Sequence, residues 1–438
     1  MYICSWIITF AEISIVLILK HMKKLLFFAV IFLLVISCRP LKRPVNVNFA
    51  HLYNPELHTL SPEFVLIHQA NDSTLLQLYI DGSQLLYVRD GREDFFLSHF
   101  QLSWYLFESF QSRNLIDSAQ IRYTDTLNID GPGMLTRETK MPVMTVNRYV
   151  LFLEFEDLNR RTRFHDVVFL DKSHPFTSQF FVFYDKEDNE FASPFFLPLN
   201  ETFQIRYGKE INFDMAVNLY STLPQIPPPP YVLIENQLIY PEELQPDTVF
   251  LAEFLQGRSS LTTSKPGFYH FHEVNNPSHG FSAFAFFRGY PQIKDAADMI
   301  KALRYITSRD EYEQLFAHDD ARYALERFWN RTAGNPDRAQ ELIIRYFNRV
   351  ENANILFTSF VPGWQTDRGM IYIIFGPPHK VHKSDNKETW EYTEGMNVPS
   401  ARFVFHYSEN NFSNNHFLLE RSTEFRSIWN HAVSVWRR

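Results

Sequence analysis

The chain has 438 residues, of which 45% are hydrophobic and 21% are charged, and its formal net charge at pH 7 is −8. This composition excludes a disordered polyelectrolyte, and the negative charge excludes a general basic field for binding nucleic acid. Two cysteines exclude a disulfide framework and a four-thiolate zinc site. The 43 Phe, 21 Tyr and 24 Pro, against only 14 Gly, favour aromatic-rich β structure with turns set by proline.

The first predicted element is an export signal. A short basic stretch begins at Met22 and includes Lys23 and Lys24, and the apolar run 25–36 that follows is too short for a spanning helix with its own flanks. The run ends in Ser37-Cys38. This order resembles the lipobox of bacterial lipoproteins, in which a small residue precedes a cysteine that is acylated and becomes the new N-terminus. The resemblance implies that Cys38 is the lipidation site.

On this interpretation residues 1–21 precede the true start, residues 22–37 are the signal peptide, and residues 38–60 are the lipidated cysteine and a tether. The alternative is an uncleaved anchor that also uses the apolar stretch 7–19. The tether is basic and proline-stiffened in its first part, residues 39–44. Surface-exposed lipoproteins of Bacteroidota usually carry acidic residues here, so the resemblance implies an outer-membrane lipoprotein that faces the periplasm. Alternatively, the basic residues only lie near lipid headgroups and do not report the leaflet.

The middle of the chain reads as short strands separated by turns. The pattern predicts one β domain over residues 61–125 and a β-sandwich over residues 126–226, of the immunoglobulin-like or fibronectin-like kind. Within the first domain, the apolar runs 75–80 and 84–88 flank Asp81-Gly82, which predicts a β-hairpin.

A run of four prolines, residues 227–230, predicts an extended boundary, followed by a small β segment that completes the stretch 227–289. The alternating stretch 268–272 would place two histidines on one face of a strand. They and two nearby residues could bind a metal ion, but no third ligand is fixed, so we favour two solvent-facing histidines and predict no metal site. The four residues concerned are His270, His272, Glu273 and His279.

Helices are predicted from about residue 290. Ser308 and Glu311 match a capping box, Gly334 ends a helix, and Asn335-Pro336 starts the next one with an N-cap and a first-turn proline. Together with the strands that follow, they predict an α+β unit over residues 290–438.

A glycine-flanked motif follows the last of these helices. After it we expect a strand over residues 370–375, a Gly-Pro-Pro turn, and further strands at 388–392, 403–407 and 417–420. The motif, in this order with its flanks, resembles the GWxTD domain family, a C-terminal module of Bacteroidota and related bacteria that often occurs in lipoproteins. The resemblance covers the chain from about residue 291. The motif residues are Gly363, Trp364, Thr366, Asp367, Arg368 and Gly369.

Two roles are open for this motif. In the first it is a structural staple for a helix-to-strand loop: the glycines allow positive φ or a close backbone approach, Thr366 and Asp367 bond local amides, Trp364 covers the sheet edge, and Arg368 pairs with Asp367 or a later carboxylate. In the second, the same side chains face a ligand. We favour the staple, because no acid, base or nucleophile is recognisable beside them.

The resemblance implies no established activity, and the sequence lacks a nucleophile elbow, a Walker A loop, a dinucleotide-binding fingerprint and an H-E-x-x-H pair. We therefore predict no catalytic residue and no cofactor. The expected function is that of a non-catalytic outer-membrane lipoprotein, bound to the membrane through its lipid and to another envelope protein, without nucleic acid. The alternative is a periplasmic hydrolase or carbohydrate-binding protein with a site near the GWxTD loop.

A weaker pattern, Asp-Ser/Thr followed by a residue with a methyl or apolar group, occurs four times. It resembles the periplasmic O-glycosylation sequon of Bacteroidota, although such tripeptides also arise by chance at turns. The candidate acceptors are Ser73, Ser118, Thr126 and Thr248.

Overall fold

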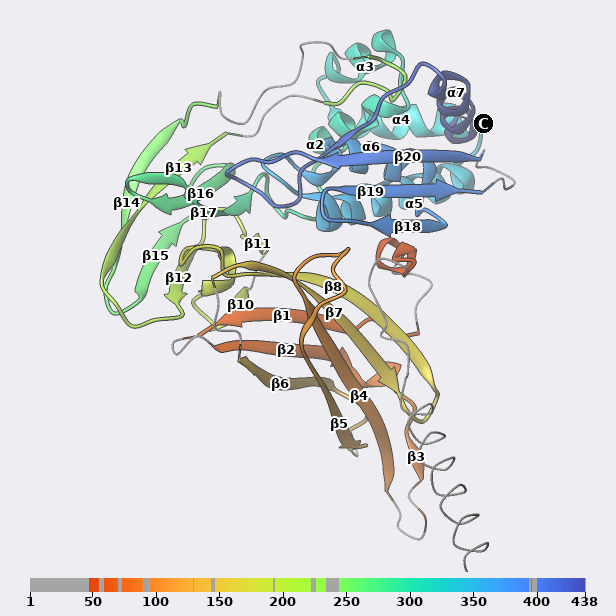
Figure 1. Ribbon diagram of the computed structural model, residues 1–438. Coiled ribbons are helices and arrows are strands. Elements are labelled where there is room, and N and C mark those ends of the chain that lie inside the picture. Colours follow the sequence, from red (N-terminus) through yellow and green to blue (C-terminus); the bar gives the residue numbers. More distant parts are fainter. Residues whose placement is uncertain are drawn as a thin grey trace, which may run out of the picture. The chain divides into compact units, whose positions relative to one another are not determined.

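The computed structural model describes residues 47–54, 59–69, 73–89, 91, 95–128, 130–142, 146–191, 194–221, 226–233, 244–393, 395 and 400–437 (Figure 1). The predicted signal peptide, Cys38 and the first part of the tether lie outside the described residues. The described residues all belong to one unit that begins at Pro44.

Eight strands between residues 63 and 171 form a sandwich of two antiparallel sheets. One sheet has the order β1-β2-β6, and in the other β4 pairs with β3, β5 and β7, while β7 pairs with β8. The strands are β1 (Glu63–His68), β2 (Ser73–Asp81), β3 (Val88–Arg89), β4 (Phe96–Phe107), β5 (Leu115–Thr126), β6 (Met134–Pro142), β7 (Arg148–Asp157) and β8 (Thr162–Asp171).

The larger sheet of this first sandwich is buried on both faces. Side chains such as Phe100 and Leu151 pack against the smaller sheet, whereas Phe107 and Phe152, on the other face, belong to the core that also contains the C-terminal helices. The middle of β7, residues 149–153, is therefore a continuous apolar run, whereas β4 is continuously apolar only over its last four residues, 104–107.

The predicted hairpin of residues 75–88 is wrong. Strand β2 pairs with β1 and β6, and Asp81 instead caps a short 3₁₀ helix, η5 (Gly82–Gln84), by accepting a hydrogen bond from the backbone N–H of Ser83. The Asp-Gly pair thus turns the chain out of the sheet. A turn pair fixes the local bend, but which strands it joins depends on pairing partners far along the chain.

A second sandwich follows between residues 181 and 285. Its sheets have the orders β10-β9-β12-β15 and β11-β17-β16-β13-β14, and they enclose an aromatic core that includes Phe183, Phe271 and Phe281. The strands are β9 (Phe181–Tyr184), β10 (Glu190–Phe191), β11 (Phe195–Phe196), β12 (Thr202–Tyr207), β13 (Phe213–Tyr220), β14 (Thr248–Phe254), β15 (Arg258–Thr262), β16 (Gly267–Glu273) and β17 (Asn276–Ala285).

The strands that pair in each sandwich come from stretches of the chain that differ from the predicted domains. Residues 125 and 126 are the last two of β5, and β6 returns to the first sandwich, so no domain begins there. The segment after the proline run supplies β14 to β17, which complete the second sandwich. Strand pairs of high sequence separation create these domains, and local turn signals do not report them.

The C-terminal region is α+β, as predicted. Its helices are α2 (Ala296–Ala302), η8 (Leu303–Tyr305), α3 (Arg309–Phe316), α4 (Ala321–Ala333), α5 (Pro336–Phe357), η9 (Gly363–Gln365), α6 (Asp367–Phe375) and α7 (Phe425–Trp436). The capping box of Ser308 and Glu311 and the cap at Asn335-Pro336 are confirmed, and Gly334 ends α4 with a φ of 79°.

Four strands in the order β18-β19-β20-β21 form the C-terminal sheet beside α5 and α6 (Figure 1). They are β18 (Lys380–Lys383), β19 (Lys387–Tyr392), β20 (Ala401–Tyr407) and β21 (Phe417–Leu419). The strand predicted at residues 370–375 is wrong, because this segment is the body of helix α6. Every residue of the helix is buried, so its apolar run carries no periodicity, and burial alone does not separate a helix from a strand.

A short N-terminal 3₁₀ helix, η2 (Ala50–Tyr53), packs with the C-terminal region although it is more than 300 residues away in sequence. The backbone N–H of Phe49 donates to Val381 O of β18 at 2.9 Å, and the Asn48 side chain accepts from the N–H of Val381 at 2.9 Å. Among the described residues, no helix is both long and apolar enough to cross a membrane.

Candidate functional site: the Gly363–Gly369 segment

The motif lies between two helices, not between a helix and a strand. Gly363 begins η9 directly beneath α5, and a Cβ atom at this position would lie 1.9 Å from Ala353 O. A Cβ atom at Gly369, in the first turn of α6, would lie 2.0 Å from Gly363 O. The predicted close backbone approach is therefore confirmed for both glycines, and neither adopts a positive φ.

Thr366 joins the two short elements. Its hydroxyl donates to Gly363 O at 2.7 Å and accepts from the N–H of Gly369 at 3.0 Å, so it caps the N-terminus of α6. This is the local backbone bonding that the sequence predicts for a threonine here.

Trp364 is buried in the main C-terminal core. Its backbone N–H donates to the Asn354 side chain at 3.1 Å, and its carbonyl accepts from the Tyr305 hydroxyl at 2.7 Å. The indole packs edge-on to Tyr305 and fills the space between helices. The prediction that Trp364 covers a sheet edge is therefore wrong.

Asp367 bonds distant parts of the chain instead of local amides. One carboxylate oxygen accepts from the N–H of Leu419 in β21 at 2.8 Å, and the other pairs with the Arg421 guanidinium. Arg421 also donates to Pro228 O at 2.8 Å and to Pro229 O at 2.9 Å. Burial raises the pKa of Asp367, and Arg421 and the N–H of Leu419 oppose this shift. The aspartate thus ties α6 to β21 and, through Arg421, to the proline run.

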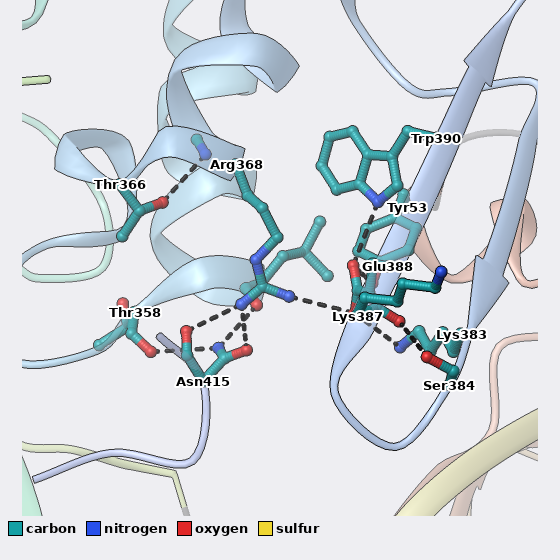
Figure 2. A network of polar contacts seen from close by, with 12 residues as sticks. Tyr53, Thr358, Thr366, Arg368, Lys383, Ser384, Lys387, Glu388, Trp390 and Asn415 are labelled. Carbon is teal, nitrogen blue, oxygen red and sulfur yellow. Dashed lines mark hydrogen bonds and ion pairs between the residues drawn. The ribbon is translucent and has the colours of Figure 1, made fainter. Parts of the chain in front are cut away.

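Arg368, the next residue of α6, makes the polar contacts shown in Figure 2. It pairs with Glu388 of β19 at 3.2 Å, which confirms the predicted pairing with a later carboxylate, and it donates to Asn415 O at 2.8 Å. Its guanidinium carbon lies 4.1 Å from the ring centroid of Phe417. Only 3% of the Arg368 side chain and 6% of the Glu388 side chain are exposed, so this ion pair is shielded from solvent.

Glu388 is the centre of the network in Figure 2. Besides Arg368, it accepts hydrogen bonds from the Tyr53 hydroxyl at 3.0 Å and from the Trp390 indole at 3.1 Å. The ammonium of Lys383 lies 3.7 Å from the carboxylate. Burial acts to raise the pKa of Glu388, but Arg368 and Lys383 together hold it below its usual value. The carboxylate therefore stays ionised at neutral pH and is fully used in internal contacts.

Several of these partners were not singled out from sequence, among them Tyr53, Asn354 and Arg421. Tyr53 binds Glu388 with its hydroxyl, and its carbonyl accepts from the Tyr372 hydroxyl at 2.9 Å. Its only sequence signal is an aromatic residue shortly after the tether, which is not specific. For Arg421, in the segment after β21, the sequence carries no signal at all.

The four candidate metal residues do not form a metal site in the described part of the chain. Strand β16 forms as predicted, but His270 and His272 are buried and not solvent-facing. His270 bonds Ser282 at 3.1 Å, and the Nδ1 of His272 bonds the carbonyl of Glu273 at 2.9 Å. His279 bonds the Glu273 carboxylate at 3.1 Å.

The candidate glycosylation acceptors all lie on strands. Ser118 is exposed in the middle of β5, Thr126 is exposed at its end, and Ser73 and Thr248 begin β2 and β14 in half-buried positions. Ser118 therefore sits in an extended strand and not in a turn. Modification at any of the four stays a prediction.

Comparisons with known proteins now add to this geometry. The model of the GWxTD domain matches residues 267–438, so the match starts at β16 of the second sandwich, earlier than the predicted start near residue 291. No curated protein sequence matches the chain. Among solved structures, the chain is similar to a transglutaminase from red sea bream with 8% identity and a TM-score of 0.19. That similarity covers 49% of this chain and only 28% of the transglutaminase, and it supports no inference about fold or activity. The family match and the motif geometry together establish that the chain contains a GWxTD domain, which spans residues 267–438.

Proposed function

We propose that this protein is a non-catalytic, lipid-anchored component of the outer membrane that faces the periplasm. It binds an envelope partner through its sandwiches and uses the GWxTD domain as the structural base that holds them. The lipid on Cys38 supplies the membrane attachment.

One observation carries the non-catalytic part of this proposal. The charged and polar groups of the motif are engaged inside the protein: Asp367 with Arg421, Arg368 with Glu388, and Thr366 with backbone atoms. A hydrolase with its site at this segment would need at least one of these groups to face a substrate. Breaking either buried ion pair would cost about 3–5 kcal/mol, which a substrate would have to supply.

The membrane attachment is supported by the Ser37-Cys38 junction after an apolar run. Within the predicted tether, the described residues 47–53 pack against the GWxTD domain. A diacylated or triacylated cysteine anchors a protein firmly, because each buried CH₂ contributes about 0.8 kcal/mol.

The test is fractionation of the wild-type protein and of Cys38→Ala in a host that processes lipoproteins, with mass spectrometry of the N-terminal peptide. Cys38→Ala should accumulate as an unprocessed precursor and leave the outer-membrane fraction. Arg309→Ala, at an exposed ion pair on α3, is the control and should fractionate like the wild type. A Cys38→Ala protein that still matures and still fractionates with the outer membrane would refute the anchor.

A further inference from the structure

An open groove lies between the two sandwiches. It has a volume of about 580 Å³ and is lined by β1 and β2 on one side and by β9, β10, β12 and β15 on the other. This volume falls in the range of sites for small organic ligands. The groove is remote in sequence from the GWxTD motif, and none of the motif residues lines it.

The polar lining of the groove is unusual in its chemistry. Apart from His68, its polar side chains outside the tyrosines are all planar amide, carboxylate or guanidinium groups: three glutamines, two glutamates and two arginines. Within the described part of the chain, six of these side chains form no hydrogen bond or ion pair. These six are Gln69, Glu190, Arg206, Glu210, Gln256 and Arg258.

The arrangement of the arginines is fixed by the sheet. Arg206 and Arg258 are directly opposite each other on β12 and β15, where two like charges repel. The Arg206 guanidinium lies over the Tyr184 ring, with 4.6 Å between its carbon and the ring centroid. Tyr184 belongs to β9, on the other side of β12 from β15, so Arg206 leans away from Arg258. Stacking orders this guanidinium while its N–H donors stay available.

The charged side chains that line the groove indicate which class of ligand it can bind. Two glutamates balance two arginines, so the groove offers no net field to a polyanion or a polycation. Planar groups with two donors, two acceptors or one of each instead match pairs of neighbouring hydroxyls, which can both donate and accept. Buried Leu75 and Val182 form an apolar base of the groove, and the half-buried Tyr184 ring offers an apolar surface to the C–H face of a sugar ring.

We propose that the groove between the sandwiches binds an oligosaccharide whose hydroxyl pairs are read by Glu190, Arg206, Arg258 and the glutamines around them. The proposal deepens the binding role given above by naming its ligand class, and it rests on that role. It moves the site away from the GWxTD segment, where the polar groups are already used.

The test uses the full chain solubilised in detergent and an array of defined oligosaccharides that includes chitotetraose and maltotetraose. The array hits, chitotetraose and maltotetraose are titrated by isothermal calorimetry. We expect saturable binding to at least one oligosaccharide, and we expect Glu190→Ala and Arg258→Ala each to weaken it by about tenfold or more, because each removes a charge-assisted hydrogen bond. Both side chains are exposed, so these variants should fold normally.

The matched controls are Glu313→Ala and Arg309→Ala, which remove the same side chains from the exposed surface of α3. They should bind like the wild type. Absence of binding to every oligosaccharide at millimolar concentration would overturn the proposal, and so would binding that the groove variants leave intact. Because the titration does not use the membrane, its failure leaves the Cys38 fractionation result standing, and the reverse also holds.

Discussion

The GWxTD segment and the groove between the sandwiches use the same residue types in opposite ways. In the segment, arginines and carboxylates are paired with each other and shielded from solvent. In the groove, arginines and carboxylates face the open space and have no ion-pair partner among the described residues. The charged residues of the GWxTD motif suggest a functional site, but in this structure they hold helices and strands together. The charged residues that are available to a ligand line the groove, and they belong to no sequence motif.

The largest expected effect comes from removing one partner of the buried pair. Arg368→Ala leaves Glu388 ionised and buried beside Lys383, and we expect a loss of about 3–5 kcal/mol in the free energy of unfolding. Urea denaturation of the purified protein measures this loss. Arg309→Ala, at an exposed ion pair on α3, is the control and should change stability by less than about 0.5 kcal/mol. Equal stabilities of the two variants would mean that the Arg368 network is not structural.

Trp364→Ala tests the packing part of the comparison. The indole is buried in the main core, and its removal should cost about 3–5 kcal/mol, partly through the cavity left behind. The cellular abundance of the variant should fall with its stability, while oligosaccharide binding per folded molecule should not change. If the variant melts like the wild type but has lost its binding, the segment is a ligand site after all.

The pH dependence of stability should report three buried histidines. Burial lowers the pKa of His68, of His270 and of His416 to about 4 each, whereas the unfolded chain titrates near 6.5. Between these pH values the unfolded state therefore binds more protons than the folded state. The contribution of these histidines to the free energy of unfolding is fully present above pH 6.5 and is lost as the pH falls toward 4. Each histidine should contribute up to about 3 kcal/mol to this loss.

Comparing His270→Gln with the wild type isolates that contribution. The slope of unfolding free energy against pH, measured by urea denaturation between pH 4.5 and 6, should decrease by about one proton in the variant. His431→Gln, at an exposed position on α7, should leave the slope unchanged. An unchanged slope in His270→Gln would show that His270 titrates normally in the folded protein.

Asp367→Asn should have a smaller effect on stability than Arg368→Ala. The amide oxygen can still accept from the N–H of Leu419, but the charge-assisted bond to Arg421 is lost, so we expect a cost of about 1–3 kcal/mol. The melting temperature and the cellular abundance of the variant should decline together. A variant that keeps its melting temperature but loses oligosaccharide binding would place Asp367 in a functional site.

The smallest effect should come from the groove. Glu190→Gln and Arg258→Gln change exposed side chains with no ion pair in the described structure, so stability should stay within about 0.5 kcal/mol of the wild type. Differential scanning calorimetry checks this. A loss of several kcal/mol would show that these charges support the contact between the sandwiches, and the contrast with the GWxTD segment would disappear.

Features that depend on neighbours in sequence were predictable. The capping box at Ser308, the cap at Asn335 and the left-handed end of α4 at Gly334 each follow from residues within one turn of the helix. The β-rich first part and the α+β last part follow in the same way from local pattern and composition.

Features that depend on residues far away in sequence were not predictable. Residues 370–375 read as a strand because burial on all sides removes the periodicity that marks a helix. A later carboxylate could be expected for Arg368, but its identity as Glu388, 20 residues on, could not. The groove could not be predicted for the same reason, because the strands that line it, β1 and β2 in the first sandwich and β9, β10, β12 and β15 in the second, lie far apart in sequence.

The contacts of residues 47–53 with β18 and Glu388 determine which part of the molecule would first bear a force applied to the N-terminus. If the chain is held at its N-terminus and pulled by a bound partner, the force first reaches the hydrogen bonds of Phe49 and Asn48 with Val381, and the Tyr53 contact with Glu388. The first sandwich, which follows directly in sequence, is loaded only after these contacts break. The C-terminal domain, which is synthesised last, would thus be the first to resist a force applied at the N-terminus.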